Sequence, residues 1–203
     1  LVRDPEECVL SLVVREPDIA DSRINDAKID RAGRFWFGSC QDDGRTPTGR
    51  IYRFGPDRNL AVMDHPYSIP NGFAMDCQGA IFYCCVGKRG VMRIAPGGEV
   101  SMFCDRAATT AIDTPNFCSF DAEGNLYVSI SSVGANDLAG LQSALMTPNG
   151  TGALVRIRPN GVGELVGQGF HFANGTAISP EEDAIYVLQS ATHDCMRLPI
   201  RKD

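Results

Sequence analysis

The stretch TPNFCSFDAEGNLYVS (residues 114–129) carries a spacing that recurs along the whole chain. Asn116 is followed five residues later by Asp121, three later by Gly124, and then by the apolar-aromatic pair Leu126–Tyr127. Aspartate and glycine at this spacing are typical of a tight corner, and the flanking apolar residues are typical of strands. The stretch therefore predicts a strand, a tight turn and a second strand.

The same spacing occurs four times. The other copies are INDAKIDRAGRFW, PNGFAMDCQGAIF and ANGTAISPEEDAIY, with Ser179 in the aspartate place of the last one. Their leading asparagines and that of the first stretch, in chain order, are Asn25, Asn71, Asn116 and Asn174, at intervals of 46, 45 and 58 residues. A second hairpin follows in the first three units, with the turn pairs Pro56–Asp57, Gly97–Gly98 and Asn160–Gly161. Four short strands in about 45 residues match a blade of a β-propeller.

We therefore expect an all-β fold, a β-propeller of four-stranded antiparallel blades, in one domain of residues 1–203. The expected blade units are about 23–68, 69–113, 114–172 and 173–203. The fourth unit ends after three strands, and residues 8–15 are expected to form an outer strand, which must pair because an open edge invites aggregation. That strand either closes a ring of four, or the four units belong to a six-bladed ring, which is the arrangement we expect.

One stretch has helical periodicity. In NDLAGLQSALM (residues 136–146), four apolar side chains can share one face of a helix: Leu138, Leu141, Leu145 and Met146. The stretch accounts for the extra length of the third unit, so we expect a loop insertion and a candidate lid.

Composition excludes several classes of function. The net charge is −6 and the 19 Lys and Arg residues are scattered, so no basic surface for nucleic acid is expected. No apolar run reaches 18 residues, so no membrane partner is expected. The three histidines have no metal-type spacing, and no nucleophile-elbow, P-loop or dinucleotide-binding motif is present.

The cysteines predict a compartment. None of the eight forms a C-x-x-C pair, and Cys8, Cys84, Cys104, Cys118 and Cys195 fall within apolar runs. Reduced thiols in such runs behave as small core residues. We expect buried free thiols in a reducing compartment, and therefore a cytoplasmic protein.

The four asparagines are the candidate ligands. In a propeller the first strand of each blade lines the central channel, and each asparagine is expected just before that strand, at the channel mouth. Amide oxygens there would suit a hard divalent cation, Ca²⁺ first, with Mn²⁺, Mg²⁺ or Zn²⁺ as further options. The alternative is that each asparagine only shapes its own turn, and glycine after Asn71 and Asn174 favours that alternative.

The segments SRINDAKIDRAGRFWFGS, QDDGRTPTGRIYRF and IPNGFAMD resemble the senescence marker protein (regucalcin)/gluconolactonase family. The match is specific over residues 17–76 and looser over 77–203, where residues 172–200 also resemble lactonases of the bacterial drug-response type. The resemblance implies a six-bladed propeller that hydrolyses sugar lactones with a divalent metal in its channel.

Carried over by position, the resemblance makes Arg23 and Asn25 substrate-binding residues and Asn71 a metal ligand. Asn116 stands where the family has an aspartate that is both metal ligand and general base. The family's E-G-P motif, which supplies the first acidic ligand, is absent from this chain. An amide cannot accept the proton of an attacking water, and general base catalysis contributes about 10²–10⁴-fold. Asp26 and Asp113 are the alternative bases.

The sequence thus predicts a metal-dependent hydrolase of sugar-type lactones, whose ligand is a small lactone or sugar acid. The predicted metal ligands are Asn71, Asn116 and Asn174, and Asn116 also takes the catalytic position. The alternative is a catalytically degenerate propeller that binds a small ligand or a protein. Arg23, Asn25 and Asp26 favour the hydrolase, whereas the amide at Asn116 favours the binding module.

Overall fold

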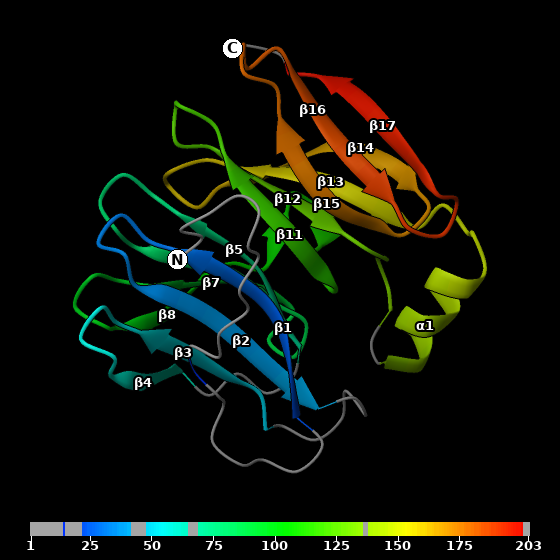
Figure 1. Ribbon diagram of the computed structural model, residues 1–203. Helices are drawn as coiled ribbons and strands as arrows, with labels where there is room; N and C mark the ends of the chain where they lie inside the picture. Colours follow the sequence, from blue (N-terminus) through cyan, green and yellow to red (C-terminus); the bar gives the residue numbers. More distant parts are fainter. Residues whose placement is uncertain (1–13, 15–21, 42–47, 65–68, 136–137, 201–203) are drawn as a thin grey trace, which may run out of the picture.

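The structure is a computed structural model that describes residues 14, 22–41, 48–64, 69–135 and 138–200 (Figure 1). The first sheet contains β1 (Ser22–Ile29), β2 (Phe35–Gln41), β3 (Arg50–Phe54) and β4 (Leu60–Asp64). The second contains β5 (Pro70–Met75), β6 (Ile81–Cys85), β7 (Gly90–Ile94) and β8 (Val100–Cys104). The third contains β11 (Pro115–Phe120), β12 (Leu126–Ile130), β13 (Gly152–Ile157) and β14 (Gly163–Phe170). The fourth contains β15 (Ala173–Ile178), β16 (Ala184–Gln189) and β17 (Asp194–Pro199).

The predicted all-β fold of four-stranded antiparallel sheets is confirmed, and the fourth sheet has the three strands that the sequence predicts. The first strands of successive sheets, β1, β5, β11 and β15, lie side by side through the middle of the molecule (Figure 1). The predicted outer strand at residues 8–15 lies outside the described residues, apart from Val14. No helix in the described part of the chain is long and apolar enough to cross a membrane.

The repeated aspartates form the corners between first and second strands. Asp30 accepts hydrogen bonds from the backbone N–H of Ala32 and Arg34, both at 2.9 Å, and from the indole Nε1 of Trp36 at 2.9 Å. In the fourth unit Ser179 takes this role, because its hydroxyl accepts the N–H of the residues four and five positions on. The turn function predicted for these positions is therefore confirmed.

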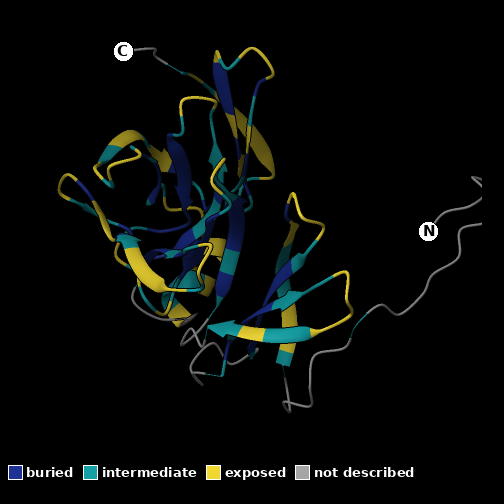
Figure 2. Cartoon of the chain, turned by 90° about the vertical axis from the view of Figure 1, so that its left-hand side faces the viewer, coloured by how far each residue is buried: buried dark blue, intermediate teal, exposed yellow. Residues whose placement is uncertain are grey.

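Each of the first three sheets buries its repeated aromatic residue against the next sheet. Trp36 packs with Phe73, Phe82 with residues of the third sheet, and Tyr127 with residues of the fourth. These three aromatic side chains are 2–4% exposed, whereas Tyr186, at the same position of the fourth sheet, is 39% exposed. Full burial of a large apolar side chain contributes about 1.5–3 kcal/mol. Figure 2 shows the buried, dark-blue segments along strands in the interior of the molecule.

Two elements modify the repeat. The helix α1 (Leu138–Met146) forms within the insertion predicted at 136–146, but Leu145 and Met146 are exposed, so the helix does not bury the whole predicted apolar face. A short hairpin of β9 (Arg106–Ala107) and β10 (Thr110–Ala111), which the sequence pattern did not predict, adds to the edge of the third sheet. There β9 pairs in parallel with β14.

The described cysteines are free thiols, as predicted. The buried ones are Cys40, Cys84, Cys85, Cys104 and Cys118. The prediction for Cys195 is wrong, because this residue lies on the edge strand β17 and is exposed, as is Cys77 in a turn. Cys8 lies outside the described residues.

Candidate functional site

The four asparagines lie inside the first strands rather than just before them, so that part of the prediction is wrong. Each lies where the pairing of the first with the second strand shifts register: between Ile24 and Ala27, Asn71 and Phe73, Pro115 and Phe117, and Ala173 and Thr176. Such a β-bulge leaves a residue unpaired and redirects its side chain. Asn25, Asn116 and Asn174 are themselves unpaired at their bulges, whereas Asn71 pairs with Cys84 and Gly72 is the unpaired residue.

Asn71 and Asn116 are brought into direct contact across two sheets. Nδ2 of Asn71 donates to Oδ1 of Asn116 at 3.0 Å, and Nδ2 of Asn116 donates to Oγ of Ser131 at 2.8 Å. The Ser131 hydroxyl donates to the carbonyl oxygen of Ala173, the residue before Asn174, at 3.0 Å. A line of hydrogen bonds therefore runs from the second sheet to the fourth.

Arg23 and Asn25 form a pair beside this line. Nη1 of Arg23 donates to Oδ1 of Asn25 at 2.6 Å, and Nδ2 of Asn25 donates to the carbonyl oxygen of Pro70, next to Asn71, at 2.9 Å. At the other end, Nδ2 of Asn174 donates to Oγ of Ser190 at 2.9 Å. No direct hydrogen bond joins the side chain of Asn25 or Asn174 to another of the four described asparagines.

The close approach of the second and third sheets depends on Gly72. Its φ is +46°, and a Cβ atom there would lie 2.5 Å from the carbonyl oxygen of Asn116 and from Cα of Phe117. The Cys118 thiol donates to the Gly72 carbonyl at 2.9 Å. Behind this contact, burial and the neighbouring Cys118 thiol raise the pKa of Cys84 well above its ordinary value. The Cys84 thiol is therefore a protonated packing group and not a nucleophile.

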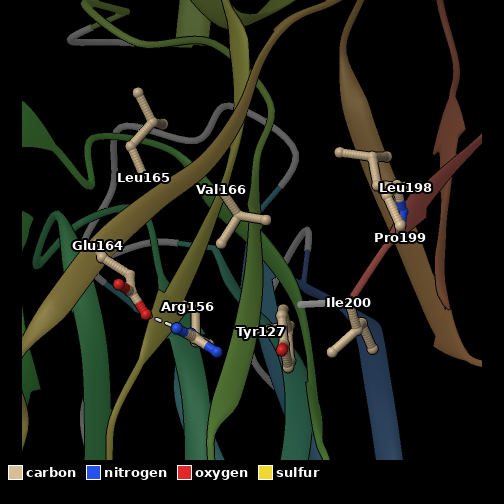
Figure 3. A pocket seen from close by; sticks show the side chains of 8 residues that line it. All are labelled: Tyr127, Arg156, Glu164, Leu165, Val166, Leu198, Pro199 and Ile200. Atoms are coloured by element: carbon tan, nitrogen blue, oxygen red, sulfur yellow. Dashed lines mark hydrogen bonds and ion pairs between the residues drawn. The ribbon is translucent and has the colours of Figure 1, made fainter. Parts of the chain in front are cut away.

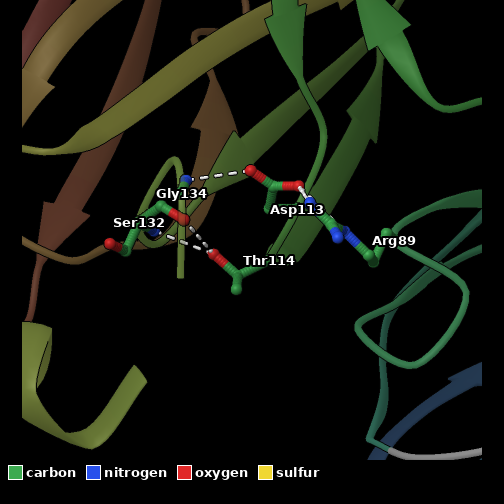
Figure 4. Close-up of polar contacts among 5 residues, drawn as sticks. All are labelled: Arg89, Asp113, Thr114, Ser132 and Gly134. Carbon is green, nitrogen blue, oxygen red and sulfur yellow. Dashed lines mark hydrogen bonds and ion pairs between the residues drawn. The ribbon is translucent and has the colours of Figure 1, made fainter. Parts of the chain in front are cut away.

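The two alternative bases are both engaged in structural contacts. Oδ2 of Asp26 accepts the backbone N–H of Phe73 at 3.0 Å, which ties the first sheet to the second. Asp113 is 4% exposed and accepts Arg89 through Oδ1 and the N–H of Gly134 through Oδ2 (Figure 4). Asp113 therefore anchors the loop after β12, and neither contact gives these carboxylates a catalytic role.

The insertion that contains α1 starts at the end of the third sheet where Asn116 lies, because Pro115 pairs with Ile130. Its first turn is held by Asp113 and its last by His171, whose Nδ1 accepts the N–H of Gly150 at 3.0 Å. The insertion is thus hydrogen-bonded at both ends, and its function as a lid stays a prediction.

A cavity of about 460 Å³ lies elsewhere, between the third and fourth sheets (Figure 3). Its lining includes the ion pair of Arg156 with Glu164 and apolar side chains of Leu165 and Leu198. None of the four asparagines lines it. The candidate site and this cavity are therefore separate features.

The described residues contain no group of three or more His, Cys, Asp or Glu side chains that could hold a metal ion. The oxygen ligands that the first strands supply at this end are the side-chain amide oxygens of the asparagines. Within the described residues, Oδ1 of Asn71 and Oδ1 of Asn174 accept no hydrogen bond, while Oδ1 of Asn116 accepts one. Neutral oxygens fit a weakly held hard cation such as Ca²⁺, whereas zinc prefers imidazole, thiolate and carboxylate.

The serines of β12 and the following loop are the part of this network that the sequence pattern missed. Ser129 donates to the carbonyl oxygen of Asn174 at 2.5 Å and accepts the N–H of Phe117 at 3.1 Å. Ser129 lies in β12 and Ser131 directly follows its last residue, so the two serines alternate with Val128 and Ile130 and both point to one face. That alternation of hydroxyls on a buried strand is the signal that was available in the sequence.

A family model described as the SMP-30/Gluconolactonase/LRE-like region matches residues 1–87 and 85–203. A gluconolactonase of Zymomonas mobilis is 28% identical over 158 residues, covering 71% of this chain and 44% of that protein. An L-arabinolactonase of Azospirillum brasilense is 32% identical over 124 residues, covering 57% of this chain and 41% of that protein. The chain spans about half the length of the curated relatives it matches.

The solved structures give the same fold. Regucalcin from Agrobacterium tumefaciens, described as a calcium-binding protein, superposes with a TM-score of 0.66 at 20% identity. The superposition covers 92% of this chain and 60% of that one. At this identity the likeness establishes the fold, and the predicted β-propeller is confirmed.

Proposed function

Because the chain belongs to the SMP-30/gluconolactonase/LRE-like family, we propose that it is part of a metal-dependent hydrolase of sugar-type lactones. The observation that supports this most is the contact of Asn71 with Asn116, next to the Arg23–Asn25 pair, at one end of the first strands. The relatives named gluconolactonase and L-arabinolactonase support the substrate class. We further propose a six-bladed ring to which this chain contributes four blades, and a reducing compartment that keeps the thiols free.

The roles of the side chains follow from their chemistry. Asn71, Asn116 and Asn174 would hold the cation through amide oxygens, and a divalent ion bound there supplies the Lewis acid that polarises a lactone carbonyl. The Arg23 guanidinium and the Asn25 amide would hold ring hydroxyls or the carboxylate of a sugar acid. Asn116 can orient a water but cannot take its proton, so turnover should be slow.

Turnover of sugar lactones by the purified chain tests the proposal. Hydrolysis of glucono- and arabinono-lactones should require added Ca²⁺ or Mn²⁺ and should stop with a chelator. Asn71→Ala and Asn116→Ala should each remove it, whereas Asn160→Ala, in an exposed hairpin turn, should not. Asn116→Asp should raise turnover about 10²-fold or more by supplying a base. Turnover that survives both alanine substitutions would overturn the site.

One observation favours the second candidate, a non-catalytic propeller that binds a small ligand or a protein. Both polar ends of the Asn116 amide are already bonded, to Asn71 and to Ser131. In that case the chain should bind a sugar acid without hydrolysing any lactone, and Asn116→Asp should give no gain in turnover.

A further inference from the structure

We propose that Ser131 is a positioning residue: it fixes the orientation of the Asn116 amide and, through Asn116, that of Asn71. The inference starts from a backbone carbonyl, which can only accept hydrogen bonds. The carbonyl oxygen of Ala173 lies 3.0 Å from Oγ of Ser131, so the single hydroxyl proton of Ser131 points to it. Towards Asn116, at 2.8 Å, Oγ is then left as an acceptor.

The direction of the next two bonds follows. Asn116 must turn its NH₂ group to Ser131, so its Oδ1 faces Asn71. Asn71 must then donate its own NH₂ group across 3.0 Å. Its Oδ1 is left over as an acceptor, and no described residue donates to that oxygen. One hydroxyl therefore decides which end of two amides is available for a ligand.

The surroundings keep Ser131 in place. Its side chain is 1% exposed, so bulk water cannot replace the hydroxyl, and its backbone N–H donates to the carbonyl of Thr114 at 3.0 Å. The Asn116 side chain is half-buried, and an amide that loses its partner either stays unsatisfied or rotates to find another one. Loss of the Ser131 hydroxyl therefore frees the Asn116 amide to rotate.

The chemical consequence rests on the proposed function. An acceptor oxygen on Asn71 suits a cation or a ligand hydroxyl, whereas an outward NH₂ group would repel the cation. By orienting Asn71, Ser131 thus favours a ligand that places a cation or a hydrogen-bond donor against Oδ1 of Asn71. An anion would be favoured only if the side-chain amides of Asn71 and Asn116 were both rotated by 180°, so that Asn71 presented its NH₂ group to the ligand.

The test is hydrogen exchange of the asparagine side-chain amides, followed by NMR on the full chain. Ser131→Ala should speed exchange of the Asn116 and Asn71 NH₂ protons at least tenfold, whereas Ser131→Thr, which keeps the hydroxyl, should leave it unchanged. The matched control is Ser119→Ala, because Ser119 donates to the Thr176 carbonyl at 3.3 Å in the same interface without contacting an asparagine. Ser119→Ala should leave both NH₂ groups protected.

If Ser131→Ala does not fold, Ser131→Cys fills the position with a thiol, which is a weak donor and a weak acceptor, and should give the same acceleration. Unchanged exchange in a folded Ser131→Ala or Ser131→Cys protein would overturn the role of Ser131. Lactone turnover is measured separately on the unsubstituted chain. If the unsubstituted chain does not hydrolyse lactones, the proposed hydrolase function is wrong. Amide exchange alone decides whether Ser131 orients Asn71 and Asn116.

Discussion

Gly72→Ala should weaken the interface between the second and third sheets, because the methyl group has no room. The added Cβ would lie 2.5 Å from both the Asn116 carbonyl oxygen and Cα of Phe117. Both atoms belong to the backbone, so a rotamer change cannot relieve the clash. The strands β5 and β11 must move apart, and the contact of Asn71 with Asn116 must lengthen.

The cost has two parts that a control separates. A positive φ costs an alanine about 1–2 kcal/mol, and overpacking adds about 1–3 kcal/mol. Gly79 has a φ of +87° and nothing within 4 Å of its Cβ position, so Gly79→Ala reports the first part alone. Gly72→Ala should therefore lower the free energy of unfolding by about 2–5 kcal/mol, and Gly79→Ala by about 1–2 kcal/mol.

Thermal and urea unfolding of the two variants measure the difference. For a chain of this size, each kcal/mol lowers Tm by about 2–4 °C. Gly72→Ala should melt about 2–12 °C below Gly79→Ala, and the slope of the unfolding free energy with urea should stay the same. If Gly72→Ala and Gly79→Ala lower the free energy of unfolding equally, the second and third sheets do not approach as closely at Gly72 as the structure has them.

Three further outcomes are expected. Burial raises the pKa of Asp30, but the hydrogen bonds from the Trp36 indole and from Arg34 outweigh burial and leave this pKa below its ordinary value. The contribution of Asp30 to the free energy of unfolding is therefore complete above the pKa of the unfolded state and is lost as the pH falls through the pKa of the folded state. Asp30→Asn should flatten the acid side of a curve of stability against pH below about pH 4. A thiol reagent should label Cys77 and Cys195 in the native protein before any of the five buried described cysteines, as peptide mass spectrometry will show. Asp113→Ala should speed amide exchange at Gly134 about tenfold or more, and unchanged exchange there would exclude the anchor.

The fold was predictable because its determinants are local. Asp30 and its counterparts make their turns with backbone N–H groups two to four positions away, and the β-propensity of the flanking runs needs no tertiary information. The same turn chemistry explains why Ser179 can replace aspartate without loss of the corner. The β9–β10 hairpin was missed because it depends on a parallel contact with β14, more than 50 residues away.

The candidate site was predictable only in part. The spacing of about one blade length between the asparagines indicated that Asn71 and Asn116 would lie near each other, and their side chains are hydrogen-bonded. The sequence pattern did not indicate that each asparagine would lie inside its strand next to a bulge, or that Ser131 would link Asn116 to the fourth sheet. Both features depend on the register between two strands, which a repeat length does not specify.

Asn116→Asp should separate catalytic benefit from structural cost. A carboxylate at this position can accept from Asn71 but cannot donate to Ser131, so the Ser131 hydroxyl must choose between the carboxylate and the Ala173 carbonyl. One buried acceptor is then left without a donor, at a cost of about 1–3 kcal/mol. The variant should therefore unfold more easily than the parent at pH 7, and added Ca²⁺ should restore more stability to it than to the parent, because the new charge strengthens cation binding. Calorimetry with and without Ca²⁺ measures both effects, and equal Ca²⁺ shifts in the two proteins would mean that position 116 does not face a cation.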